Sequence, residues 1–556
     1  MVALFTFVEE PSIISKRGEF MHSVIFNPLE EYETKYKSLH AEKTGQFFEQ
    51  LVQRSGVDIE QNRATVQQYQ QCLEGTAKLK KQLNWLLVLR VLMCITLVLI
   101  PLVILKTNPK IKQLREAIAE ADQRAADLLA EAERQMAPLN ALFTDRDALN
   151  ITQDTIPLLF FEPYFSLQQE ADMKINYDFT GNGSNEESTM DVLAGNYNGN
   201  PFIFENKLVH RMGTEVYHGY RTIHWTETYR DSNGKLRTRT RSQTLHATVT
   251  KPKPFYSTQV VLHYCAQGGP ELSFSRDASH LDQKSDKQIE RLVKQGEKKL
   301  QRKTEEAVRE NGDFMSMSNS EFEVLFDALD RTNEVQFRTL FTPLAQTNMV
   351  DLIRSKVGYG DDFAFLKRRR TNHIISEHSQ GRKVSLPAQS YASYAFDTIR
   401  ENFTGKNGEF FKAVYFDFAP ILAIPMYQER PVHSLKPIPD YTQQYSFMEC
   451  EALANVMDRR RVVHPRTKTQ AILKSSFVSA KDGIDETCIT AYSYDIEKRV
   501  DVVTMFGQDG HLHSVPVEWD AYLPLESQNH FYVAADGLAA NQSVFARRNG
   551  LSIFQS

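Results

Sequence analysis

The sequence predicts an α+β protein with N-terminal helices, one transmembrane helix, a helical stalk and a large mixed body that contains antiparallel sheets. Three observations predict this class: an apolar run at Leu83–Leu105, an apolar stripe in steps of three and four after it, and alternating runs with Asn-Gly and Asp-Gly turns beyond residue 150. The 556 residues are 41% hydrophobic and 11% aromatic, which allows several domains with buried cores. The net charge of −5 is too small to indicate nucleic-acid binding by the whole chain.

An N-terminal helical region is predicted over residues 1–82. Asn27 is followed by proline, a typical helix start, because Asn caps the first turn and proline loses no needed N–H there. We expect this helix to stop at Gly56 and a second helix to continue toward the apolar run. The first twenty residues show no clear periodicity, so Met21 is a candidate for the natural start.

The apolar run predicts a transmembrane helix at Leu83–Leu105. Its 23 residues, at ~1.5 Å rise each, match the hydrocarbon thickness of a bilayer. Arg90 is the one charge in it and lies close enough to one end to reach the interface, where Trp85 would also lie. The alternative is a buried core helix. The run therefore predicts a single-pass protein of the cell membrane, with the lipid bilayer as a partner.

The positive charges on the two sides of this span are almost equal in number, so they do not decide its orientation. The N-terminal segment is not a signal peptide, which favours a cytoplasmic N-terminus. In contrast, the large C-terminal part holds three scattered cysteines, Cys265, Cys450 and Cys488, a set more typical of a reducing compartment than of disulfides. The sequence does not decide which side of the membrane carries the large body.

A stalk helix of coiled-coil character is predicted over residues 106–143. Its apolar seam follows steps of three and four residues. The seam residues are Ile111, Leu114, Ile118, Ala121, Ala125, Leu128 and Ala132. A second copy of the chain could cover this seam and form a homo-oligomer, or the protein's own body could cover it.

The body begins with a predicted β-rich domain over residues 150–311. Asn233-Gly234 lies between the alternating runs YRTIHWTETYR and KLRTRTRSQTLHATVT and predicts a hairpin. We expect Pro252 and Pro254 to end the second strand and STQVVLHY to form a third. A highly charged helix is predicted from Asp282 to Asn311.

Two further regions are predicted. Residues 312–430 form an α+β domain in which strands dominate near FFKAVYFDFAPILAIPMY. Residues 440–556 contain a helix near Ser446–Asp458 and then antiparallel strands with a turn at Asp509-Gly510. The mixture lacks the strand–helix alternation of a parallel sheet.

The segment from Glu321 to Ile353 resembles a motif of an uncharacterised family of bacterial membrane proteins with an N-terminal transmembrane anchor and a soluble domain of unknown function. The matching residues are Glu321, Phe322, Phe326, Asp330, Val335, Phe337, Leu340, Thr342, Pro343, Met349 and Leu352. The family motif has a strand-like stretch before its Thr-Pro step. The resemblance implies a bacterial membrane protein but no activity, and its members usually have two transmembrane helices where this chain has one apolar run.

Three basic clusters are the candidate binding residues. Arg237, Arg239 and Arg241 alternate with Thr and would share one face of a strand. The other two clusters are Lys367, Arg368, Arg369 and Arg370, and Arg459, Arg460 and Arg461. Such clusters can bind lipid headgroups or nucleic-acid phosphates. Nearby acidic residues also fit a solvated, salt-bridged surface.

No metal site, cofactor or catalytic residue is predicted. The paired histidines His511 and His513, the pair His373 and His378, and a loose group in the β-rich region lack the converging ligands of a zinc site. That group comprises His210, His218, His224, His246 and His263. Nucleophile and phosphate-binding motifs are absent from the sequence. Asp361 and Asp362 are adjacent and would point to opposite sides of a strand, so they do not predict an acid–base pair.

These observations favour a membrane-anchored, non-catalytic interaction or scaffold protein. The first alternative is a membrane-surface binder of anionic ligands that uses the arginine clusters. The second alternative is a hydrolase with an unrecognised site, which would require a pocket with several titratable groups of perturbed pKa.

Overall fold

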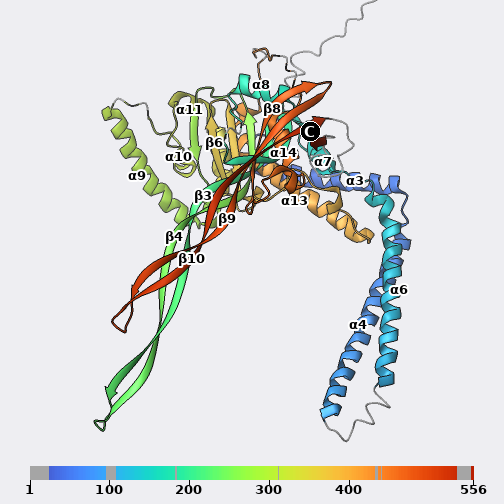
Figure 1. Cartoon of the computed structure of the whole chain (residues 1–556). Coiled ribbons are helices and arrows are strands. Elements are labelled where there is room, and N and C mark those ends of the chain that lie inside the picture. The colour runs from blue at the N-terminus through green and yellow to red at the C-terminus, as the bar shows by residue number, and fades with distance from the viewer. Residues whose placement is uncertain are drawn as a thin grey trace, which may run out of the picture. The chain divides into compact units, whose positions relative to one another are not determined.

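The computed structural model describes residues 24–95, 108–181, 184–310, 312, 314–432, 436–439, 441, 443–534 and 552–555 (Figure 1). The chain divides into two compact units. A helical unit comprises Glu30–Pro157 and Ser385–Tyr415, and a sheet-containing unit comprises the N-terminal residues up to Leu29, Leu158–Val384 and Phe416–Ser556. The described fold is a mixture of helices and antiparallel sheets.

Long helices build the helical unit. Its elements are the short α2 (Pro28–Glu31), η1 (Tyr32–Tyr36), α3 (Lys37–Ser55), α4 (Ile59–Ile95), α6 (Asn108–Asn140), α7 (Asp147–Thr155), η6 (Ala388–Ser390) and the first part of α13 (Phe396–Leu422). Helix α3 ends as predicted, because Gly56 adopts a φ of 65° and donates its N–H to the carbonyl of Val52. Aromatic side chains such as Phe48, Phe143 and Phe403 form the core of this unit.

The predicted transmembrane helix is wrong. No helix within the described ranges is both long and apolar enough to cross a membrane, which contradicts the span at Leu83–Leu105 and the single-pass membrane location. Helix α4 begins far upstream, at Ile59, and its first part is rich in Gln and Lys. Residues 96–105 of the predicted span lie outside the described residues.

The predicted stalk helix forms as α6, and its seam packs against α4 of the same chain. The Cys72 thiol on α4 donates to the carbonyl of Ala121 (3.3 Å), and Lys80 pairs with Asp122 (3.0 Å). The buried residues of α6 are Ile111, Ile118, Ala125, Ala132, Met136 and Leu139. The chain thus covers the seam itself, and the homo-oligomer through this helix stays a prediction.

The first sheet of the sheet-containing unit is antiparallel, in the order β1-β2-β3-β4-β7-β6-β5. Its strands are β1 (Leu159–Phe161), β2 (Glu187–Tyr197), β3 (Asn200–Arg230), β4 (Leu236–Cys265), β5 (Ser273–Arg276), β6 (Phe363–Arg368) and β7 (Thr371–Ser376). The predicted hairpin at Asn233-Gly234 is confirmed, with Gly234 at a φ of 76°.

Strand β4 continues through Pro252 and Pro254, where the sequence predicted its end. The two prolines lie opposite Thr214 and Met212 of β3. Among the described residues, β4 pairs with a second neighbour, β7, only from Leu262 onward, so the prolines lie on an open edge where no N–H is required. The predicted third strand STQVVLHY is therefore the end of β4.

The second sheet has the order β11-β10-β9-β8. Its strands are β8 (Ile472–Lys481), β9 (Ile484–Phe506), β10 (Leu512–Ala534) and β11 (Ser552–Gln555). The predicted turn at Asp509-Gly510 joins β9 to β10, and Gly510 has a φ of 81°.

Helices cover and connect these sheets. They are α8 (Leu167–Tyr177), η4 (Leu281–Gln283), α9 (Asp286–Glu310), α10 (Ser320–Phe326), α11 (Glu334–Leu340), α12 (Pro343–Arg354), η5 (Glu377–Ser379), η7 (Pro425–Gln428), α14 (Phe447–Asn455) and α15 (Arg459–Val462). The charged helix predicted near Asp282 is confirmed as α9. The strand-like stretch implied by the family motif is instead helix α11, which buries Phe337 and Leu340.

The strands predicted near Phe410–Tyr427 are wrong, because this stretch is the end of α13 followed by η7. Every residue from Ala413 to Ile424 is buried. A helix that is apolar on all sides has no amphipathic period, so its aromatic and branched residues resemble a buried strand.

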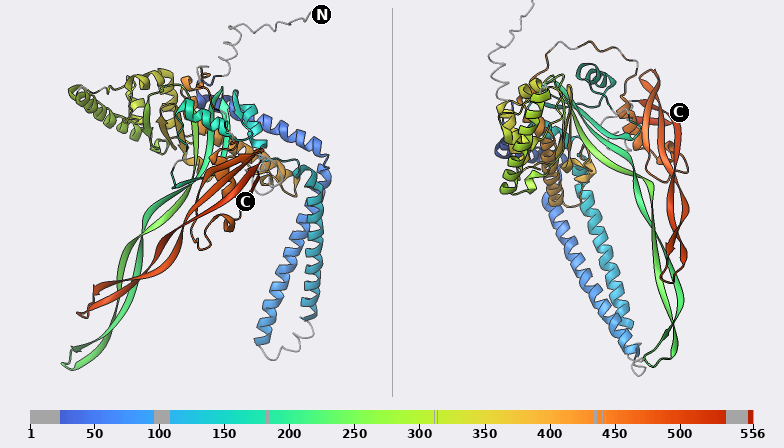
Figure 2. Two further views of the ribbon diagram at one scale, coloured as in Figure 1. Left: turned by 45° about the horizontal axis from the view of Figure 1, so that its top comes forward. Right: turned by 90° about the vertical axis from the view of Figure 1, so that its left-hand side faces the viewer.

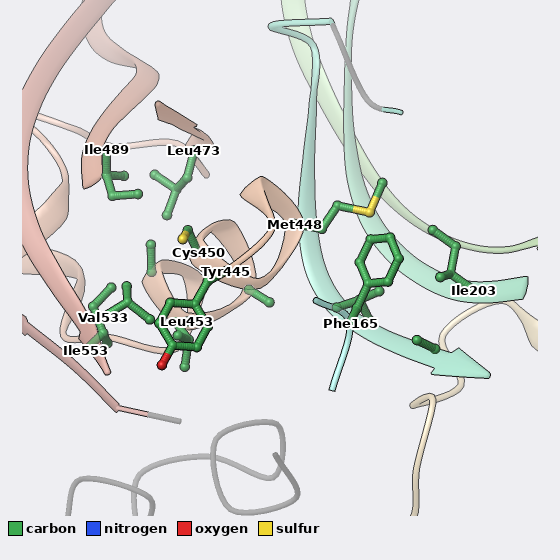
Figure 3. Packing of buried hydrophobic residues seen from close by; sticks show 14 of the residues in the cluster. Phe165, Ile203, Tyr445, Met448, Cys450, Leu453, Leu473, Ile489, Val533 and Ile553 are labelled. Carbon is green, nitrogen blue, oxygen red and sulfur yellow. The ribbon is translucent and has the colours of Figure 1, made fainter. Parts of the chain in front are cut away.

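Helix α14 lies between the two sheets and fills the main core of this unit (Figure 3). On the side of the first sheet, Met448 lies toward Phe165 and Ile203. On the side of the second sheet, Cys450 lies toward Leu473 and Ile489. Ser446 and Glu449 form a capping box that starts this helix at a defined residue.

Candidate functional site

Strands β3 and β4 extend as a long two-stranded ribbon, and the β9–β10 ribbon packs along it (Figure 2). Ile223, Leu245 and Ala247 of the first ribbon contact Val515 and Val517 of the second in one apolar cluster. These are odd-numbered positions of β3 and β4, and residues of equal parity share a face because the two strands pair odd with odd. The odd-numbered face is therefore the packed face over this stretch.

The two ribbons approach each other closely at Gly219. A Cβ atom on this residue would lie 2.2 Å from the carbonyl oxygen of Pro516, so only glycine fits. Nearby, Arg221 donates from Nη1 to the carbonyl of Ser514 at 2.6 Å. The backbone of β10 thus fixes the position of β3 at this crossing.

The predicted arginine strand lies on the odd-numbered face, near the tip of the ribbon. Arg239 and Arg241 both pair with Glu227 on β3, at 2.9 and 2.6 Å, and Arg237 pairs with Asp231 at 2.8 Å. All three arginines are exposed. Each guanidinium thus has an acidic neighbour, which reduces the positive charge available to an anion. Anion binding by this strand stays a prediction.

The even-numbered positions form a second face, which we call the outer face. Its members lie at alternate residues of β3 and β4, and every one of them is exposed. They are Met212, Thr214, Val216, His218, Tyr220, Thr222, His224, Thr226, Thr228, Leu236, Thr238, Thr240, Ser242, Thr244, His246, Thr248, Thr250 and Pro252. None of these eighteen side chains is an Asp, Glu, Lys or Arg, and the charged residue at an even position of the ribbon is Arg230, which lies opposite Leu236 at the tip. The odd-numbered face of the same span is rich in charged residues.

Hydrogen bonds and ring contacts order the outer face across the two strands. The hydroxyl groups of Thr222 and Thr244 lie 3.1 Å apart. The Nδ1 atom of His218 lies 2.9 Å from Nε2 of His246, and the ring of Tyr220 stacks on His246 with centroids 4.8 Å apart. These contacts hold the side chains of the outer face in place across the two strands.

The other two basic clusters lie elsewhere in the fold. Lys367 is fully buried on β6, and its Nζ donates to the carbonyl of Gly268 at 2.9 Å. Burial, with a contribution from Arg370, lowers the pKa of Lys367 to about 7. Arg369 and Arg370 both pair with Asp178. This cluster is consequently part of the packed interior and its rim rather than a continuous basic surface.

The third cluster lies on the short helix α15 and is exposed. Asp458 caps this helix and pairs with Arg460 at 3.2 Å. The ion pair of Arg460 with Asp458 joins two residues of the same short segment. The structure does not bring the three predicted clusters together into one site.

Within the part of the chain that the structure describes, no group of three His, Cys, Asp or Glu residues could hold a metal ion. His263 instead links Glu205 (3.1 Å) and His373 (2.7 Å) inside the sheet. Burial lowers the pKa of His373 well below its ordinary value. His513 pairs with Asp509 at the β9–β10 turn.

The adjacent acids Asp361 and Asp362 take separate partners. Asp361 forms a buried ion pair with Arg276, and burial raises the pKa of Asp361 despite that cation. Asp362 accepts from Nδ1 of His378 at 2.6 Å, and His378 also approaches Asp417 at 3.4 Å. These ion pairs and hydrogen bonds lie inside the fold, which indicates a structural role for them.

No protein-family model, no curated protein and no solved structure matches this chain. The resemblance of Glu321–Ile353 to a bacterial membrane protein family therefore stays a prediction.

Sequence reasoning missed the outer face, although the signal was present. The hairpin runs place Thr, Ser or His at most even positions from residue 214 to 250. The arginines between them drew the prediction instead, because basic residues are typical of anion-binding surfaces.

Proposed function

We propose that this chain is a non-catalytic interaction protein that assembles with a second copy of itself through the outer face. The observation that carries the proposal is the exposure of eighteen side chains, none of them Asp, Glu, Lys or Arg, on one side of the β3–β4 ribbon. Exposed β surfaces usually carry charges, which prevent association with other chains. Apart from Arg230 at the tip, this ribbon keeps its charges on the opposite face, so the outer face from Met212 to Thr228 lacks such protection.

A second copy is the partner whose chemistry fits best. Two identical outer faces can meet about a two-fold axis that sets their strands antiparallel, which keeps the two Arg230 side chains at opposite ends. Hydroxyl groups of Thr and Ser both donate and accept hydrogen bonds, so each face is complementary to itself. An acidic partner would find one cation, Arg230 at the tip, and a basic partner would find no carboxylate on this face.

The size of the outer face also suits a stable dimer. The run from Met212 to Thr228 measures about 54 Å at about 3.4 Å per residue. Its eighteen residues approach the roughly 20–30 residues that each partner contributes to a stable interface.

The test compares the oligomeric state of the full-length protein with that of a charged variant. Thr222→Lys with Thr244→Lys places two cations at the centre of the face, and four in the dimer. The matched control is Thr339→Lys with Thr347→Lys on exposed helical positions of the same unit. Light scattering after size exclusion should give a dimer for parent and control and a monomer for the outer-face variant. A monomeric parent, or a variant that stays dimeric, contradicts the proposal.

A further inference from the structure

A cavity of about 280 Å³ lies in the sheet-containing unit, between the β2–β3–β4 part of the first sheet and the α14–α15–β8 segment. Its walls are mainly apolar. They include Met190, Leu208, Met457, Val462, Ala471 and Leu473. The volume is close to the lower limit of small-molecule pockets and holds on the order of ten water-sized groups.

An irregularity in β2 shapes one wall. The β2–β3 register shifts between Thr189 and Asp191, so Met190 is the extra residue of a β-bulge. The N–H of Thr189 donates to Glu451 at 2.9 Å, and its carbonyl accepts from Asn455 at 2.8 Å. Helix α14 therefore holds the bulge in place, and Met190 lines the cavity.

One cation lies at this cavity. Arg459 lines it from α15, the helix on which sequence reasoning had predicted anion binding. The neighbouring Asp458 uses its carboxylate on Arg460, through the side chain and through the backbone N–H at 3.0 Å. Within the described ranges no ion pair joins the Arg459 guanidinium to a carboxylate, so its charge is available to a ligand.

We propose that this cavity binds the anion of a medium-chain carboxylic acid. The apolar walls take the hydrocarbon chain, each buried methylene contributing about 0.8 kcal/mol. The guanidinium of Arg459 pairs with the carboxylate, an arrangement that arginine forms with two parallel N–H donors. Asn455 and Thr258, which also line the cavity, are neutral and add no repulsion. This inference does not depend on the proposed dimer.

Calorimetric titration of the full-length protein with decanoate tests the site. We expect saturable binding of one decanoate per chain. Arg459→Gln should weaken it at least tenfold, whereas Arg460→Gln, one residue along the same exposed helix, should leave it unchanged. Ala471→Leu, which adds three carbon atoms to the wall, should weaken it as well. Decanol should bind parent and Arg459→Gln equally, because it has no charge.

Absence of saturable decanoate binding to the parent overturns the proposal. Equal binding by the Arg459→Gln and Arg460→Gln variants overturns the role of Arg459. Both arginines are exposed, so neither change removes a buried contact, and circular dichroism of each variant verifies that the fold is retained.

Discussion

Thr222 and Thr244 lie directly opposite each other across β3 and β4, and their hydroxyl oxygens are 3.1 Å apart. Threonine pairs recur toward the tip, where Thr226 faces Thr240 and Thr228 faces Thr238. Cross-strand pairs of this kind stabilise a sheet and hold the side chains in register. The outer face is therefore an ordered surface, which lowers the entropy lost when a partner binds.

The crossing of the two ribbons depends on Gly219. Gly219→Ala should destabilise the sheet-containing unit by about 1–3 kcal/mol, because the new Cβ meets the backbone of Pro516. Gly45→Ala is the control: nothing lies near this helical position, and alanine should stabilise α3 by up to about 1 kcal/mol. Amide hydrogen exchange of each unit measures both effects. Unchanged protection at the crossing would show that the ribbons do not touch there.

Glu451 predicts a pH dependence of stability. Burial raises its pKa to about 7, although Lys474 pairs with it at 2.9 Å. The folded-state pKa is above the unfolded one, so the folded protein binds more protons between pH 4.5 and 7. The free energy of unfolding should therefore fall as pH rises through this window, by up to about 3 kcal/mol more in the parent than in Glu451→Gln.

Urea unfolding at several pH values measures this difference. In a Trp85→Phe background the two remaining tryptophans, Trp225 and Trp519, report only on the sheet-containing unit. Parallel stability curves for parent and Glu451→Gln would refute the raised pKa.

The buried pair of Arg276 and Asp361 makes a third prediction. Asp361→Ala should cost about 3–5 kcal/mol, because it leaves a guanidinium that is 1% exposed without its carboxylate. Replacing both residues, as Arg276→Met with Asp361→Leu, should cost much less, since no buried charge remains. The same tryptophan fluorescence measures both variants. If the double variant is as unstable as Asp361→Ala, an unpaired buried charge is not the cause of the lost stability.

A fourth prediction concerns the seam of α6. The thiol of Cys72 lies 3.3 Å from the carbonyl oxygen of Ala121, so Ala121→Cys should form a disulfide with Cys72 inside one chain under mild oxidation. Mass spectrometry of the peptides identifies the bond. Asp127→Cys, on the exposed side of α6, is the control and should stay reduced. A covalent dimer of the Ala121→Cys variant, joined through the introduced thiol, would instead indicate that a second copy covers the seam.

Local signals predicted local structure well. Asn-Gly and Asp-Gly indicated the two long hairpins, and the three-four spacing indicated α6, because turn chemistry and helical period act over a few residues. The failures depend on distant contacts. Burial on all sides hides the helix at Ala413–Leu422, and the open edge that tolerates Pro252 is set by the short pairing of β4 with β7.

The same limit applies to the two candidate sites. The strand period predicted which residues share the outer face. It did not predict that this face is exposed, because exposure depends on which face the β9–β10 ribbon covers. The cavity beside Arg459 combines residues from β2, β3 and β8 with those of α14 and α15, which no spacing in the sequence brings together.

The most direct test of the outer-face dimer is a cysteine crosslink at its centre. A two-fold axis brings the central positions of two identical faces together. Thr244→Cys should therefore form a covalent dimer on oxidation of the full-length protein, whereas Gln243→Cys, the adjacent residue on the packed face, should not. Efficient dimer formation at position 244 alone is the result that we predict. Equal crosslinking at both positions, or none at 244, would contradict the assembly of this protein through its outer face.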